Sequence, residues 1–348
     1  MDSSRLPRCR ERIHVPCGGG SSASGRDGPT TVPEKVTVVS IRMLGKYRVD
    51  ATINRQNLIQ RVHTWVPDPV LGDMNYEHEF ANENYADLGG GIRFPTVWHH
   101  HEGWDDNFGA LNISAGHNAF GGPLKDIRAN ACPEVAVPAA VRAAEFPVVV
   151  ASERLAPGVY LVGGGTHNSV AVEFDKFIAV VEAPLDEKRS LAVIEEVVRL
   201  IPDKPIRYVV NTHQHFDHAG GLRTYMHIGA TIITHFKNFE FYNRDVLNYA
   251  PRTLAPDMVS LWPPTELTEG YQYELVRENY TLTSGSRTMH ISYVHPLAHV
   301  EGMLMAYVPG EKIAIEADLP AETLRAQVQR MGWDVKTVVP IHGKPRSF

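Results

Sequence analysis

Four side chains that can bind a metal ion stand close together at positions 213–218, in the order His-Gln-His-Phe-Asp-His. Imidazole nitrogens and carboxylate oxygens are the ligands that divalent first-row metal ions prefer. Without a cation between them, groups packed this closely would repel one another or leave polar atoms unpaired. The segment therefore predicts a metal site. We expect His213 and His215 to point toward one ion, and Asp217 and His218 toward another.

The elements before this cluster predict how it is positioned. The β-branched run from Ile206 to Val210 predicts a strand that ends just before the cluster. From Asp186 to Ile201, apolar residues recur on one helical face, which predicts a helix. Short apolar runs between residues 158 and 183 predict further strands. Strand, helix and strand in this order predict a right-handed βαβ unit that carries the cluster at its carboxyl end.

Four segments follow from composition and periodicity. Residues 1–33 are rich in Gly, Ser, Arg and Pro and predict a disordered leader. Residues 34–130 alternate with period two, as from Tyr47 to Ile53, and predict a β-rich N-terminal domain. Residues 131–147 show neither the helical nor the strand period, and we predict that they form a linker. The alternation of short apolar runs with a helical pattern in residues 148–348 predicts an α/β domain.

The whole-chain composition excludes several classes of protein. The 348 residues carry 34 Lys plus Arg against 40 Asp plus Glu, a net charge of −6, so we expect no nucleic-acid partner. No run of about 18 apolar residues occurs, so no membrane-spanning segment is predicted. The three cysteines predict no disulfide framework. Cytoplasmic location is the default expectation, with a periplasmic or secreted protein open if the N-terminus is truncated; truncation of the C-terminus is also left open.

Residues 211–221 resemble the signature of the metallo-β-lactamase superfamily. Further elements of that family have matches in the same order: His299 ahead of a strand, Asp318 at the end of the next strand, and His342 after a late strand. The resemblance covers about residues 147–348. It implies an α/β fold, an αββα sandwich of the metallo-β-lactamase type, preceded here by the smaller β-rich domain. It also implies an active site at one edge of the two sheets.

The resemblance implies a dinuclear centre with three ligands for each ion and one carboxylate between them. The first ion would take His213, His215 and His299, the second would take Asp217, His218 and His342, and Asp318 would bridge both. The expected ions are Zn²⁺, with iron or manganese left open. Two such ions lower the pKa of a bridging water, so that hydroxide exists near neutral pH. Asp217 could accept a proton from that water and is the predicted catalytic residue.

Each of the later ligands has an alternative interpretation. His295 stands four residues before His299 and could replace it. Asp318 could instead cap the helix that opens at Pro320. His342 could be a surface residue near the end of the chain.

The ligand set favours hydrolysis of an ester-type bond in a small molecule, such as a thioester or lactone. Asp318 makes the set resemble glyoxalase II-like thioesterases and lactonases, whereas β-lactamases of the family lack this carboxylate. Redox members of the family carry Glu where this chain has His215, so an oxidoreductase is disfavoured. Open alternatives are a β-lactamase, a phosphodiesterase or nuclease, an arylsulfatase, and a catalytically silent binding module. A homodimer is also left open.

Three other groups of residues have competing interpretations. His99, His100 and His101 have no carboxylate or cysteine at ligand spacing, so an exposed hairpin tip is predicted rather than a second metal site. His167 lies on a loop that the fold could bring near the metals, as a substrate contact or as an ordinary residue. The aromatic segment 236–262 could line a pocket or form a packed helix pair.

Overall fold

The computed structural model describes residues 8–14, 34–80, 84–103, 119–129, 136, 138–144, 147–247, 252–263, 272–295 and 299–348. They fall into two compact units. The first contains the described residues up to 66, together with 73–103 and 119–136, and the second contains 67–72 and 138–348. The division at residues 137 and 138 lies inside the segment predicted as a linker, where α2 (Ala139–Arg142) forms.

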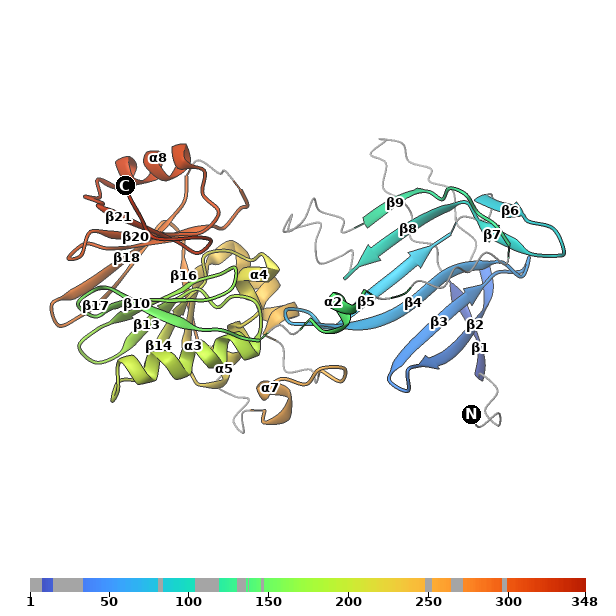
Figure 1. Ribbon diagram of the computed structural model, residues 1–348, viewed down its shortest axis with the longest axis horizontal. Helices are drawn as coiled ribbons and strands as arrows, with labels where there is room; N and C mark the ends of the chain where they lie inside the picture. The colour runs from blue at the N-terminus through green and yellow to red at the C-terminus, as the bar shows by residue number, and fades with distance from the viewer. Residues whose placement is uncertain are drawn as a thin grey trace. The chain divides into compact units, whose positions relative to one another are not determined.

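The first unit is built on an antiparallel sheet with the strand order β1-β2-β3-β4-β5-β8-β9. The strands are β1 (Arg8–His14), β2 (Glu34–Met43), β3 (Tyr47–Ile53), β4 (Ile59–Asp68), β5 (Gly72–Glu79), β8 (Val97–Glu102) and β9 (Ala119–Pro123). A small second sheet pairs β6 (Tyr85–Asp87) with β7 (Arg93–Pro95). The prediction of a β-rich N-terminal domain is confirmed (Figure 1).

Strand β1 lies inside the segment that was predicted as a disordered leader. It pairs antiparallel with β2, from Arg8 opposite Ser40 to His14 opposite Glu34. The structure thus describes residues 8–14 as a strand, and the rest of the leader lies outside the described residues. The amino-acid composition of a segment indicates how much apolar surface it can bury. It does not indicate whether the segment can form main-chain hydrogen bonds with the edge of a sheet.

The second unit contains two sheets. The first has the order β10 (Ala151–Ala156), β11 (Val159–Gly163), β12 (Ser169–Glu173), β13 (Ile178–Val181), β14 (Ile206–Val210), β15 (Thr231–His235) and β16 (Tyr273–Val276). The second has the order β17 (Asn279–Ser284), β18 (Arg287–Tyr293), β19 (Leu304–Val308), β20 (Ile313–Glu316), β21 (Thr337–Pro340) and β22 (Arg346–Ser347). Strands β13 to β16 are parallel to one another, whereas β10 to β13 are antiparallel.

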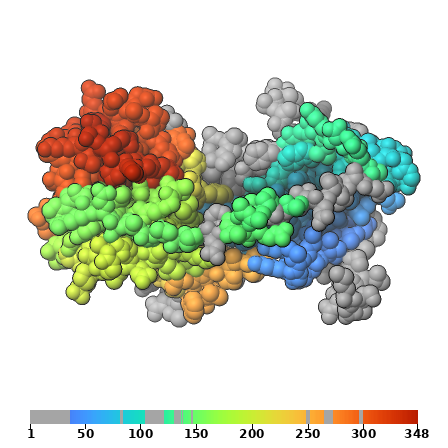
Figure 2. Space-filling model, viewed as in Figure 1, coloured from blue at the N-terminus to red at the C-terminus, as the bar shows by residue number. Residues whose placement is uncertain are grey.

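Helices cover the outer faces of both sheets and give four layers. α3 (Glu187–Leu200) and α5 (Leu222–His227) pack on the first sheet through buried side chains such as Val197 and Leu222. α8 (Ala321–Met331) packs on the second sheet through Leu324 and Val328. A third apolar cluster fills the space between the sheets. The expected αββα sandwich is confirmed, and Figure 2 shows its two halves, green to yellow and orange to red, against each other.

The predicted βαβ unit is confirmed by β13, α3 and β14. The side chain of Asp186 accepts a hydrogen bond from the backbone N–H of Arg189 and caps α3. Val193 and Val197 are buried on its inner face, as the helical spacing predicts. β13 and β14 run parallel, so the loop after β14 leaves the sheet at its carboxyl edge.

The remaining helical segments are short. They are α4 (Phe216–Ala219), η2 (Phe236–Asn238), α6 (Phe239–Phe241), η3 (Tyr242–Val246) and α7 (Met258–Leu261). Of the helices in the described part of the chain, none has the length and apolar character needed to cross a membrane.

Candidate metal centre

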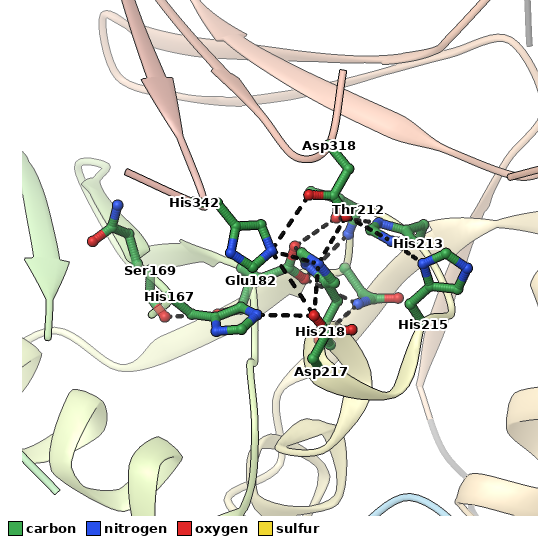
Figure 3. A network of polar contacts seen from close by, with 12 residues as sticks. His167, Ser169, Glu182, Thr212, His213, His215, Asp217, His218, Asp318 and His342 are labelled. Carbon is green, nitrogen blue, oxygen red and sulfur yellow. Dashed lines mark hydrogen bonds and ion pairs between the residues drawn. The ribbon is translucent and has the colours of Figure 1, made fainter. Parts of the chain in front are cut away.

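The seven predicted ligands leave different strands of the second unit and meet at one edge of its two sheets. Four of them follow β14 on the loop and short helix at 213–218. The other three come from the second sheet: His299 precedes β19, Asp318 follows β20, and His342 follows β21. In Figure 3, the labelled side chains of Asp217, His218, Asp318 and His342 point toward one another.

The first group consists of His213, His215, His299 and Asp318. Nδ1 of His215 lies 3.1 Å from Nε2 of His213 and 2.9 Å from Nε2 of His299. Oδ2 of Asp318 lies 3.4 Å from Nε2 of His213 and 3.5 Å from Nε2 of His299. Ligands about 2.0–2.1 Å from a tetrahedral ion lie about 3.3 Å from one another. The donor set of this group therefore fits one metal ion.

The second group includes Asp217, His218 and His342. The Nε2 atoms of His218 and His342 are 3.2 Å apart, and Oδ2 of Asp217 lies 3.7 Å and 3.9 Å from them. Asp318 also reaches this group, because its Oδ2 lies 3.1 Å from His218 and its Oδ1 lies 3.3 Å from His342. The carboxylate of Asp318 therefore stands between the two groups, as a bridging ligand would.

Asp318 adopts a left-handed backbone conformation, with φ of +56°. A residue other than glycine pays a steric cost in this conformation, and such residues cluster at functional sites. The turn directs the carboxylate away from α8, whose N-cap is Pro320 and whose first turn receives no side-chain cap. The alternative of Asp318 as a helix cap is therefore wrong.

Glu182 orients one histidine of each group. Its carboxylate has no exposed surface and accepts a hydrogen bond from Nδ1 of His218 at 3.0 Å. It also accepts the hydroxyl hydrogen of Thr212, and Thr212 Oγ1 lies 3.1 Å from Nδ1 of His213. Both imidazoles thus carry the proton on Nδ1 and present Nε2 to the centre, the arrangement in which a carboxylate supports a metal-binding histidine.

The loop of His342 is held by the loop between β11 and β12. Nδ1 of His342 donates to the carbonyl of Thr166 at 3.1 Å, which turns Nε2 toward His218. The side chain of Asn168 donates to the carbonyls of Pro340 and Gly343 at 3.0 Å and 2.7 Å. These hydrogen bonds join residues 166–168 to residues 340–343 and so fix the position of His342.

His167 lies in the centre as well, next to Asp217. Its Nε2 is 3.2 Å from Oδ2 of Asp217, and its Nδ1 is 2.7 Å from Oγ1 of Thr166. The ring is buried, and the guanidinium of the buried Arg189 donates to the His167 carbonyl at 3.0 Å. His167 thus contacts the predicted catalytic carboxylate from a fixed position.

The electrostatics of the site favour a cation. Burial lowers the pKa of the His213 imidazole, which keeps it neutral and able to bind metal. Burial alone would lower the pKa of His218 too, but the carboxylates of Glu182 and Asp318 outweigh it and raise that pKa to about 10. The hydrogen bond from His167 holds the pKa of Asp217 well below its usual range. Burial alone would raise the pKa of the Asp318 carboxyl, but this pKa is lowered as well, chiefly by the hydrogen bond from His218, so Asp217 and Asp318 are ionised and stabilise positive charge.

The structure brings His299 into the first group and leaves His295 outside both groups. The ring of His295 packs on Tyr293, with the ring centroids 4.1 Å apart. In the aromatic segment 236–262, Phe241 and Tyr242 are fully buried in the core, so at these two positions the packed alternative holds.

The histidines at 99–101 are not a hairpin tip. They lie within β8, where His100 and His101 are buried. Glu79, on the neighbouring strand β5, pairs with His99 and lies near both His99 and His101. The sequence prediction is wrong because it considered only carboxylates at short spacing, whereas a sheet places residues twenty positions apart side by side.

Sequence reasoning also missed Glu182 and Thr212. Glu182 directly follows the buried strand β13, which is parallel to the strand that carries the cluster. A single carboxylate at the carboxyl end of an apolar parallel strand was the signal that could have identified it.

Comparison with known proteins agrees with this fold. Residues 162–319 match the family model of the metallo-beta-lactamase superfamily. No curated protein sequence matches the chain.

Solved structures with a similar fold include proteins of different function. One is a metallo-beta-lactamase from Pontibacter korlensis, with 15% identity, a TM-score of 0.43, and coverage of 57% of this chain and 94% of that one. A flavodiiron protein from Giardia intestinalis has 20% identity and a TM-score of 0.42, covering 58% and 57%. A stereoselective inverting sec-alkylsulfatase from a Pseudomonas species has 16% identity and a TM-score of 0.43, covering 57% and 39%.

Proposed function

Because residues 162–319 match the family model of the metallo-beta-lactamase superfamily, we propose that the protein is a dinuclear metal-dependent hydrolase that cleaves an ester-type bond in a small molecule. The proposed substrates are thioesters, lactones and related compounds, and the proposed ions are Zn²⁺. The seven proposed metal ligands are His213, His215, Asp217, His218, His299, Asp318 and His342.

One observation carries the proposal. The carboxylate of Asp318 has its Oδ2 within 3.5 Å of His213, His218 and His299, and its Oδ1 3.3 Å from His342. A carboxylate shared by two histidine groups holds two cations close together, and such pairs suit the cleavage of bonds to an electrophilic carbonyl. Two ions bound there would supply an activated water and a Lewis acid for the substrate oxygen.

The protein's own residues complete this chemistry. His167 holds Oδ2 of Asp217 at 3.2 Å, which leaves Oδ1 of that carboxylate to accept the proton of the attacking water. The side chain of Asp217 is about half exposed, so substrate can reach it. Glu182 keeps His213 and His218 in one tautomer, so neither ligand has to reorganise during turnover.

The experiment that tests the proposal is an activity screen of the zinc-loaded full chain. The panel contains thioesters, lactones, phosphodiesters, aryl sulfates and a chromogenic cephalosporin. We expect the highest kcat/KM on a thioester or lactone, with loss of that activity in the Asp318→Ala variant. The control is His290→Asn, whose side chain lies on β18 outside both groups.

Two results would contradict the proposal. If the highest kcat/KM is found on the cephalosporin, a phosphodiester or an aryl sulfate, the proposed ester-type substrate class is wrong. Equal activity of the Asp318→Ala and His290→Asn variants on every substrate would remove the shared carboxylate from the reaction.

A further inference from the structure

We propose that the first unit holds a separate site for one divalent transition-metal ion, formed by Glu79, His99 and His101. These residues share no ligand with the centre in the second unit, so the proposal does not depend on the hydrolase function. The site would be of the two-histidine, one-carboxylate type, which binds zinc in some proteins and ferrous iron in others.

The geometry of the three side chains fits a single ion. Oε2 of Glu79 lies 3.6 Å from Nε2 of His101 and 3.9 Å from Nδ1 of His99. One ligand atom from each residue lies within 4.8 Å of the other two. Ligands of a tetrahedral zinc ion lie about 3.3 Å apart, so the two distances from Glu79 exceed this value by about 0.3 Å and 0.6 Å.

The sheet fixes this arrangement. His99 and His101 are two residues apart on β8, so their side chains point to the same face. Their ring centroids are 4.3 Å apart. On the adjacent strand β5, Glu79 is directly opposite His99, and Glu77 is directly opposite His101. All four side chains therefore lie on one face of two paired strands, which positions the ligands without a flexible loop.

Two carboxyl groups and one guanidinium lie close together on this face. Glu77 is buried, and its carboxyl group lies beside that of Glu79, with which it interacts. Both interact with the guanidinium of Arg61, whose Nε lies 3.1 Å from Oε1 of Glu77 and whose Nη2 donates to Oε1 of Glu79. Arg61 contacts Oε1 of Glu79, and the proposed ion would bind Oε2, the oxygen that faces the two histidines.

The site is open on the side of His99. The His99 side chain is 45% exposed, whereas that of His101 is 8% exposed, so an ion can reach the group from the solvent. β9 places Gly121 opposite His99, and a Cβ atom there would lie 3.4 Å from Cδ2 of the ring. Glycine at this position therefore leaves the His99 ring uncrowded on the side of β9.

The test is the zinc content of the untagged full chain, measured by elemental analysis after equilibration with zinc and gel filtration. We expect three equivalents in the unsubstituted chain and two in His99→Asn. The matched control is His78→Asn on the opposite face of β5, which should retain three equivalents. His99 is half exposed, so its replacement should leave folding intact, as a thermal melt of the metal-free chains would verify.

A second measurement separates this site from the dinuclear centre. In a chain that carries Asp318→Ala and His218→Ala, one equivalent of zinc should remain, and adding His99→Asn should remove it. The same zinc content in His99→Asn and His78→Asn would overturn the proposal. So would the absence of bound zinc in the double variant, provided that the circular dichroism of its first unit is unchanged.

Discussion

The carboxylate of Glu182 and Nδ1 of His218 form a hydrogen bond of 3.0 Å with no exposed surface on either side chain. This contact decides which nitrogen of His218 faces the site, because a carboxylate accepts the Nδ1 hydrogen and leaves Nε2 as the donor atom for metal. Glu182 itself sits at a φ of +80°. The proposed metal centre therefore depends on a residue that is not among the proposed ligands.

The Glu182→Gln variant should weaken metal binding at the centre by 10- to 100-fold, as loss of a supporting carboxylate typically does. The measurement is competition against a chromogenic zinc chelator. Glu153→Gln, at an exposed position on β10, is the control. Equal zinc affinity in both variants would show that Glu182 does not support the ligands.

The Asp217→Ala variant should lose at least about 100-fold in kcat, the usual contribution of a positioned proton acceptor. Its side chain is half exposed, so the free energy of unfolding of the metal-free protein should change by less than about 1 kcal/mol. Turnover is measured on the best substrate of the screen, and unfolding is followed in urea. Unchanged turnover would remove Asp217 from the mechanism.

Removal of metal should abolish hydrolysis and lower the melting temperature, because bound ions stabilise the folded state by mass action. In the His99→Asn chain, which lacks the third proposed site, the expected content is two equivalents of zinc. Dialysis against a chelator and refilling with zinc should remove and restore activity together. A metal content near zero after gentle purification would contradict the assignment of the centre.

Acid should destabilise the second unit partly through Asp257. Burial alone would raise the pKa of this carboxyl group, but hydrogen bonds from Arg223 and Ser260 outweigh it and hold the pKa well below its usual range. A lowered folded-state pKa adds stability above the unfolded value near 3.8, and this stability is lost as the pH falls.

The Asp257→Asn variant tests this pH dependence. At pH 7 it should cost roughly 1–3 kcal/mol, because the buried Arg223 loses its charged partner. The difference from the unsubstituted protein should shrink below about pH 3.8. Urea unfolding of the metal-free chains at pH 7 and pH 3 measures both values, and a difference independent of pH would refute the ionic contribution.

The Gly220→Ala variant should fold poorly and lose metal. A Cβ atom at this position would lie 1.9 Å from the carbonyl oxygen of Leu185, so either α4 or the loop before α3 must shift. Gly310→Ala is the control, since nothing lies within 4 Å of a Cβ there. Thermal melting and zinc content compare the two variants, and equal values would show that the close approach is not required.

The sequence by itself predicted most of the second unit. Local patterns carry the information for α3, for the strands on either side of it, and for the cluster at 213–218, because helix caps, apolar periodicity and ligand spacing act over a few residues. The resemblance added His299, Asp318 and His342 as expected partners. None of these three could be placed near the cluster by spacing alone.

Only the tertiary structure decided how distant residues meet. It selected His299 over His295, turned Asp318 toward both groups instead of the helix, and brought Glu182 under His213 and His218. It also paired β5 with β8 and so placed Glu79 beside two histidines. Strand pairing and backbone turns with positive φ set these contacts, and their energy comes from packing across the whole fold, which no short stretch of sequence encodes.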